Sequence, residues 1–110
     1  MRIWHEKLIP KLCQKHLCAM WREGLGCYKI ITENKKGYRN HPATKEWENA
    51  PHHLRERIHC VYLEMIARGY KPKQMPPVSA TMLTGEVIKE WQTLEQQIEI
   101  LKAKGCKCKV

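Results

Sequence analysis

Hydrophobic residues recur along this chain at helical spacing. From about residue 11 to residue 32, apolar side chains return every three or four positions, which is typical of a helix with one buried face. At about 100° per residue, that face comprises Cys13, Leu17, Met20, Trp21, Gly24, Tyr28 and Ile31. Pro10 separates this helix from a short N-terminal segment, and the polar residues 34–37 (NKKG) end it.

A second long helix is predicted after a polar connection. Residues 37–50 form a loop with one short helix after Pro42, and Pro51 begins the second helix at a position where its missing N–H does no harm. The apolar face of this helix comprises Leu54, Ile58, Val61, Tyr62, Met65 and Ile66. Gly69 then provides a left-handed cap.

A third helix is expected after the proline-rich residues 71–80. Thr84 is its predicted N-cap and Gly105 its end. Its apolar positions are Val87, Trp91, Leu94, Ile98 and Leu101. Because no strand-like alternation and no repeat is present, we predict an all-α fold, a single small domain of three main helices around one core.

The composition indicates an anionic partner. Twenty Lys and Arg residues against eleven Asp and Glu residues give a formal net charge of +9, which favours nucleic acid over a membrane; an otherwise ordinary basic surface is the alternative. No apolar run approaches the ~20 residues of a membrane span, and no secretory signal is visible. We therefore expect a cytoplasmic protein with no membrane partner.

Six cysteines raise the question of disulfides or a metal. Disulfides are not expected without secretion. No zinc-finger spacing connects the first four, which are Cys13, Cys18, Cys27 and Cys60. The C-x-C of Cys106 and Cys108 falls short of a four-ligand set. We predict free thiols, no metal and no cofactor; a metal-binding regulator is the weakest of the functional alternatives.

Two features of the first helix suggest chemistry. Glu23 lies roughly 100° from the centre of the apolar face, and His16 lies two turns earlier on the same edge. A carboxylate there is suited to proton transfer, although an ordinary surface glutamate fits the periodicity as well. Gly24 on the buried face predicts close packing of another helix, whereas Gly26 lies off that face and predicts close approach by a ligand backbone.

The N-terminus is a second candidate. Because Arg2 is large, we expect Met1 to be retained. A terminal amine titrates at about 7.7–8.0, and nearby cations lower its pKa further, which leaves a neutral amine nucleophile at neutral pH.

Four ordered blocks of the sequence resemble a single family. They are residues 1–4 (MRIW), 16–17 (HL) followed by 21–24 (WREG), 37–42 (GYRNHP) and 68–70 (RGY). Over residues 1 to about 71 the set resembles the pyrimidine-dimer DNA glycosylases of the phage endonuclease V type. The resemblance implies an endonuclease V-like fold and a DNA repair enzyme acting on double-stranded DNA with damaged pyrimidines. We therefore interpret residues 1–71 as a glycosylase-like region with a catalytic N-terminus, and 72–110 as the linker, third helix and basic C-x-C tail of the same domain.

The resemblance also implies a mechanism. In this family the N-terminal amine displaces the damaged base, forms a Schiff base with the sugar, and cuts the strand by β-elimination as an apurinic/apyrimidinic (AP) lyase. Met1 and Glu23 are the implied catalytic residues. The expected DNA contacts are Arg2, His16, Arg22, Gly26, Lys36, Tyr38, Arg39 and His41. Packing roles for the histidines and Tyr38 stay open, as does a non-catalytic nucleic-acid-binding helical protein of the same fold; we expect a monomer.

Overall fold

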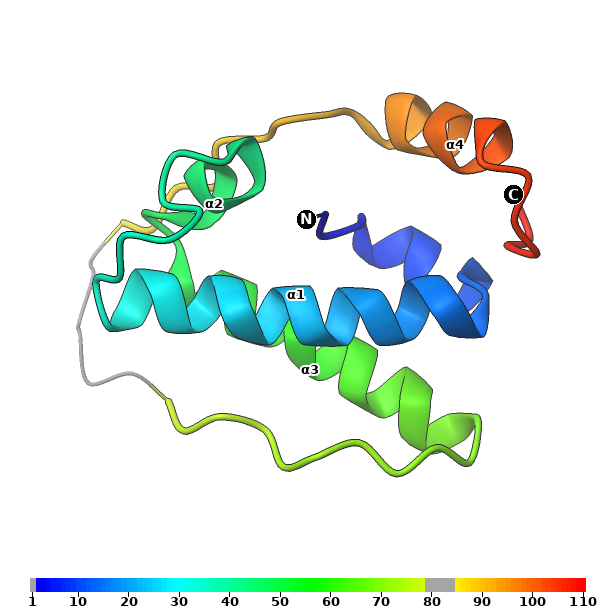
Figure 1. The fold of residues 1–110 in the computed structure, drawn as a ribbon, viewed down its shortest axis with the longest axis horizontal. Coiled ribbons are helices and arrows are strands. Elements are labelled where there is room, and N and C mark those ends of the chain that lie inside the picture. Colours follow the sequence, from blue (N-terminus) through cyan, green and yellow to red (C-terminus); the bar gives the residue numbers. More distant parts are fainter. Residues whose placement is uncertain (1, 79–84) are drawn as a thin grey trace.

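Two long helices lie against each other, and the rest of the chain wraps around them (Figure 1). The computed structural model describes residues 2–78 and 85–110. Its elements are a 3-10 helix η1 (Glu6–Lys11) and the α-helices α1 (Gln14–Thr32), α2 (Pro42–Trp47), α3 (Pro51–Ala67) and α4 (Leu94–Ala103). No strand occurs in the residues described, so the predicted all-helical fold is confirmed.

The core forms where the predicted faces of α1 and α3 meet. Leu17 and Met20 of α1 are buried with Leu54 of α3. The two helices approach closely at Gly24, because a Cβ added there would lie 3.0 Å from Cγ1 of Ile58. The close packing predicted at this glycine is confirmed. Trp21 and Tyr28, also predicted to lie in the core, are 6% and 5% exposed.

The start of α1 differs from the prediction. The helix begins at Gln14 and not at residue 11, because η1 occupies the preceding segment and includes Pro10. Leu12 then takes an extended conformation, with φ −69° and ψ 141°, which interrupts helical hydrogen bonding. Cys13 consequently stands before the helix as its N-cap and not on its apolar face.

The predicted signals around α3 are confirmed. The short helix after Pro42 is α2, and α3 begins at Pro51. Gly69 has φ +83°, and its N–H donates to the carbonyl of Ile66 at 2.9 Å. The next amide, of Tyr70, donates to the carbonyl of Met65, which completes a left-handed helix end.

The third helix begins later than its apolar period predicts. Thr84 lies outside the described residues, and α4 starts only after Thr93, whose hydroxyl accepts from the Gln96 amide in a reciprocal capping box. Val87 and Lys89 lie upstream in a non-helical segment. Their amides donate to the backbone carbonyls of Asn49 and Glu46, in and just after α2. Those tertiary hydrogen bonds replace the helical bonds that the spacing predicted.

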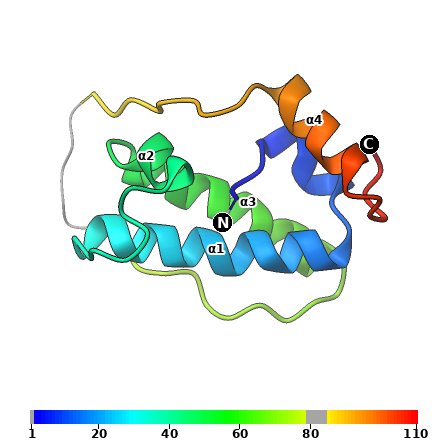
Figure 2. The ribbon, with the colours of Figure 1, turned by 45° about the horizontal axis from the view of Figure 1, so that its top comes forward.

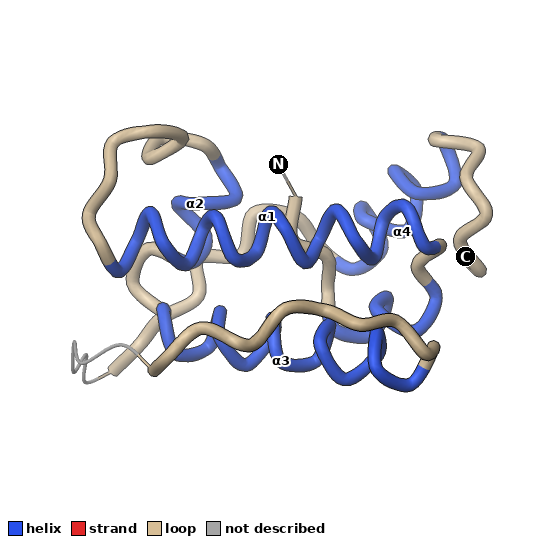
Figure 3. Tube along the Cα trace, turned by 60° about the horizontal axis from the view of Figure 1, so that its bottom comes forward, coloured by secondary structure: helices blue, strands red, loops and turns tan. Residues whose placement is uncertain are grey.

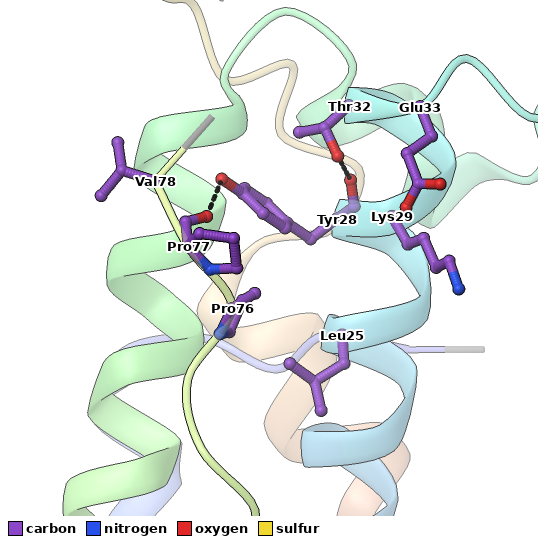
Figure 4. A pocket seen from close by; sticks show the side chains of 8 residues that line it. All are labelled: Leu25, Tyr28, Lys29, Thr32, Glu33, Pro76, Pro77 and Val78. Atoms are coloured by element: carbon purple, nitrogen blue, oxygen red, sulfur yellow. Dashed lines mark hydrogen bonds between the residues drawn. The ribbon is translucent and has the colours of Figure 1, made fainter. Parts of the chain in front are cut away.

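Two irregular segments run on opposite sides of the α1–α3 pair (Figures 1 and 3). Residues 85–93 and α4 lie on the side of the N-terminus, as the turned view in Figure 2 also shows. Residues 71–78 cross the other side and carry no helix, as expected. The Tyr28 hydroxyl holds this second segment by donating to the carbonyl of Pro77 at 3.1 Å (Figure 4). The pocket of about 390 Å³ beside it contains none of the predicted site residues.

Candidate active site

The start of the N-terminal segment lies against the middle of α1. The backbone N–H of Arg2 donates to Oε2 of Glu23 at 2.8 Å, across 21 positions of sequence. Buried Ile3 and Trp4 hold the segment in place. Arg57 of α3 adds a hydrogen bond of 2.9 Å from its guanidinium to the Trp4 carbonyl. The fold thus places the carboxylate of Glu23 beside Arg2.

The side chain of Arg2 lies between two indole rings. Its Cζ is 5.0 Å from the ring centroid of Trp4 and 4.8 Å from that of Trp91. It also donates to Oε1 of Gln92. Burial lowers the pKa of Arg2, and the negative charge of Glu23 opposes that effect. Each cation–π contact is worth about 0.5–2 kcal/mol, so the two rings fix the direction of the guanidinium.

A pocket of about 310 Å³ opens around these groups. Its lining comprises Arg2, Trp4, His16, Ala19, Glu23, His41, Trp91 and Lys104. Glu23 is the single carboxylate among these eight residues, whereas Arg2 and Lys104 are cations. Such a lining suits an anionic ligand whose reacting group approaches the carboxylate.

The two histidines of the pocket are held by packing and hydrogen bonds. Nδ1 of His41 accepts from the Ala43 amide at 3.1 Å and caps α2, while the ring lies edge-on to Trp91 at 5.8 Å. The His16 ring lies edge-on to Trp4 at 6.2 Å. Burial lowers the pKa of both histidines, and neighbouring positive charges lower it further. Both shifts favour the neutral imidazole over the charged form.

The remaining predicted contacts lie outside the pocket lining. Arg22, Gly26 and Lys36 are exposed, and an added Cβ at Gly26 would have no atom within 4 Å. Tyr38 is 69% exposed and has φ +55°. Arg39 donates to the carbonyl of Ile30 at 3.4 Å, which ties the loop to α1. Of the predicted residues that the structure describes, the pocket brings together Arg2, His16, Glu23 and His41; Met1 lies outside the described residues.

Four lining residues were not predicted as site residues, namely Trp4, Ala19, Trp91 and Lys104. Trp4 belongs to the block of residues 1–4 (MRIW), so among these residues it was the easiest to predict from the sequence. We predicted Trp91 on the core face of a longer third helix, and we made no prediction for Lys104. Trp91 lies at the pocket because residues 85–93 pass the N-terminal segment (Figure 2), and Lys104 lines it from the end of α4. No local sequence pattern signals this arrangement.

The fold and the pocket define a small, basic, helical protein whose N-terminal segment meets a helix glutamate in a cation-lined cavity. A family model described as pyrimidine dimer DNA glycosylase matches residues 1–76. The chain therefore belongs to the pyrimidine dimer DNA glycosylase family. No curated protein and no solved structure gave a match. Among the described residues, no helix has both the length and the apolar character that a membrane crossing needs.

Proposed function

We propose that this protein is a DNA glycosylase and AP lyase acting on pyrimidine dimers or related base lesions in double-stranded DNA. The observation that carries the proposal is the 2.8 Å hydrogen bond from the Arg2 amide to Glu23. Covalent geometry keeps an α-amine within about 4 Å of the next amide nitrogen. Met1 is joined to Arg2 by one peptide bond, which supports the assignment of its amine as the nucleophile and of Glu23 as the partner carboxylate.

The proposed reaction uses the Met1 amine as the nucleophile. The amine attacks C1′ of the damaged nucleotide, the base leaves with the glycosidic electron pair, and the amine loses a proton as the sugar opens to a Schiff base. Removal of a C2′ proton then expels the 3′ phosphate by β-elimination. Glu23 stabilises the cationic sugar and exchanges protons with it, because a carboxylate next to developing positive charge lowers the barrier.

Recognition of DNA is assigned to the surface around the pocket. An enzyme of this kind distorts or flips the nucleotide and anchors the backbone on either side. Arg2, fixed between its indoles, directs its charge at the lesion region, while exposed Arg22 and Lys36 are available to phosphates. The open surface at Gly26 leaves room for the DNA backbone.

Borohydride trapping tests the amine. The protein is incubated with duplex DNA containing one abasic site and reduced, which converts a Schiff base into a stable adduct. We expect an adduct with the free N-terminus and none after N-terminal acetylation. Unimpaired DNA binding without any adduct would instead show a non-catalytic nucleic-acid-binding protein.

Replacement of the carboxylate tests the role of Glu23. Glu23→Gln retains an acceptor for the Arg2 amide but loses the charge, so cleavage of dimer-containing DNA should fall by about 10²–10⁴-fold with DNA affinity nearly unchanged. Glu56→Gln is the control, because Glu56 is an exposed glutamate on α3. Loss of DNA affinity as large as the loss of cleavage would contradict the assigned role.

A further inference from the structure

A second side-chain cluster lies where α1 begins. It consists of the thiols of Cys13, Cys106 and Cys108 and the imidazole of His16, and one ligand atom from each lies within 4.8 Å of the others. Two local pairs build it, a C-x-x-H at the start of α1 and the C-x-C that follows α4. The sequence places these pairs about 90 positions apart, and the fold brings them together.

The distances within this cluster fit a tetrahedral metal ion. Nδ1 of His16 lies 3.1 Å from Sγ of Cys13 and 3.3 Å from Sγ of Cys108. Around zinc, with bonds of about 2.3 Å to sulfur and about 2.0–2.1 Å to nitrogen, neighbouring ligand atoms stand about 3.5–3.8 Å apart. His16 and its two sulfur neighbours therefore need only small outward shifts to surround an ion, and all four ligand atoms already lie within 4.8 Å of one another.

One backbone hydrogen bond and three nearby lysines suit a metal ion held by thiolate ligands. The backbone N–H of Cys13 donates to Sγ of Cys108 at 3.1 Å, which stabilises negative charge on that sulfur. Three thiolates, one neutral imidazole and Zn²⁺ carry a net charge of −1. Lys15, Lys104 and Lys107 line the adjoining pocket and complement that charge.

We propose that Cys13, His16, Cys106 and Cys108 form a structural Cys3His zinc site. Soft thiolates with an imidazole select zinc over magnesium or calcium, and four protein ligands leave no open position for catalysis. All four residues are half-buried, so the ion is shielded from solvent yet can enter. We predicted no metal site because no single stretch of the sequence has the spacing of a four-ligand zinc site. The fold completes the set by bringing Cys106 and Cys108 to Cys13 and His16.

The zinc site fastens the C-terminal tail to the start of α1. Gly105, with φ +62°, turns the chain after α4, and the Lys109 amide donates to the carbonyl of Lys11 at 2.7 Å. Lys104 lines both the candidate active-site pocket and the pocket beside the zinc ligands. Fastening the tail therefore also helps to position Lys104 at the candidate active site. Two of the ligands lie within residues 1–76, which the family model matches, and two lie beyond them.

Metal analysis of the full chain tests the proposal. The protein is purified under reducing conditions without chelator, equilibrated with Zn²⁺ alone, desalted and analysed by mass spectrometry of the elements. We expect about one zinc per chain. Cobalt(II) in place of zinc should give the visible bands of a tetrahedral site and a thiolate charge-transfer band.

Matched cysteine variants locate the ion. Cys106→Ser and Cys108→Ser should each weaken zinc binding by at least about 100-fold, while Cys60→Ser, at an exposed thiol on α3, should retain full affinity. Zinc well below one per chain in the reduced wild type would overturn the proposal. Equal affinity in all three variants, or a disulfide between cluster cysteines that persists when zinc is supplied, would do the same. Because no DNA is present, failure here leaves the glycosylase proposal untouched.

Discussion

At the residue scale, Glu46 shows how burial changes the chemistry of a side chain. This glutamate of α2 is partly buried, and burial raises its pKa to about 7; Arg57 opposes the shift and Glu90 adds to it. In the unfolded chain the carboxyl titrates near 4.5. The folded protein therefore binds this proton more tightly, and its stability falls as the pH rises from about 4.5 to about 7.

Glu46→Gln should remove this pH dependence. At pH 8 the variant should be more stable than the wild type by about 1–2 kcal/mol, a figure reduced for partial solvent screening. At pH 4.5 the two proteins should be nearly equal. Urea unfolding at both pH values measures the difference, and exposed Glu99→Gln on α4 is the control. A stability gap that is larger at low pH would contradict the burial of an ionised Glu46.

At the element scale, α1 tolerates two glycines for different reasons. Gly24 faces α3, where even a Cβ would contact Ile58 at 3.0 Å. Gly26, only two positions later, faces open space. A helix interior loses about 1 kcal/mol with each glycine relative to alanine. Close packing of two helices compensates at Gly24, whereas access for DNA is our proposal for Gly26.

The same substitution at the two glycines should separate these reasons. Gly24→Val should destabilise the fold by about 1–3 kcal/mol, because the added volume displaces α3. Gly26→Val should change stability by less than about 0.5 kcal/mol but slow cleavage of dimer-containing DNA. Thermal unfolding and cleavage assays measure both effects. Equal loss of stability at both positions would show that the approach of α3 at Gly24 is not tight.

At the scale of the whole molecule, the net charge of +9 sets the way in which DNA binding depends on salt. Cations on the surface displace counterions from the phosphates when the complex forms. Exposed Lys36 lies in the loop between α1 and α2. Exposed Lys73 lies on the segment 71–78, which crosses the side of the α1–α3 pair that faces away from residues 85–93 (Figure 3). The two lysines therefore provide a comparison between faces at equal charge.

The logarithm of the DNA-binding constant should fall steeply and linearly with the logarithm of salt concentration. Lys36→Gln should reduce this slope by about 1, the effect of one lost phosphate contact, while Lys73→Gln should leave it unchanged. Fluorescence anisotropy across a salt series gives both slopes. A reduced slope for Lys73→Gln alone would place the DNA on the other face.

The sequence predicted most of the architecture because local signals and packing agree over residues 14–69. The period of apolar residues, Pro51 and Gly69 each act within a few positions, so most of α1 and α3 formed as expected. The exceptions are the start of α1, which begins at Gln14, and Ile66 of the predicted α3 face, which is exposed. The prediction was wrong for the third helix, where hydrogen bonds from Lys89 to Glu46 and a capping box at Thr93 displaced its start. Tertiary bonds of this kind leave no periodic trace.

The sequence by itself determined the helical core, the basic charge and the family, since each depends on residue type and on spacing within a helix. Only the tertiary structure decided which distant groups meet. It placed the Arg2 amide against Glu23, Trp91 against the Arg2 guanidinium, and Cys108 against His16. These contacts arise from chain segments crossing each other, and their geometry depends on how the helices pack rather than on any spacing along the chain.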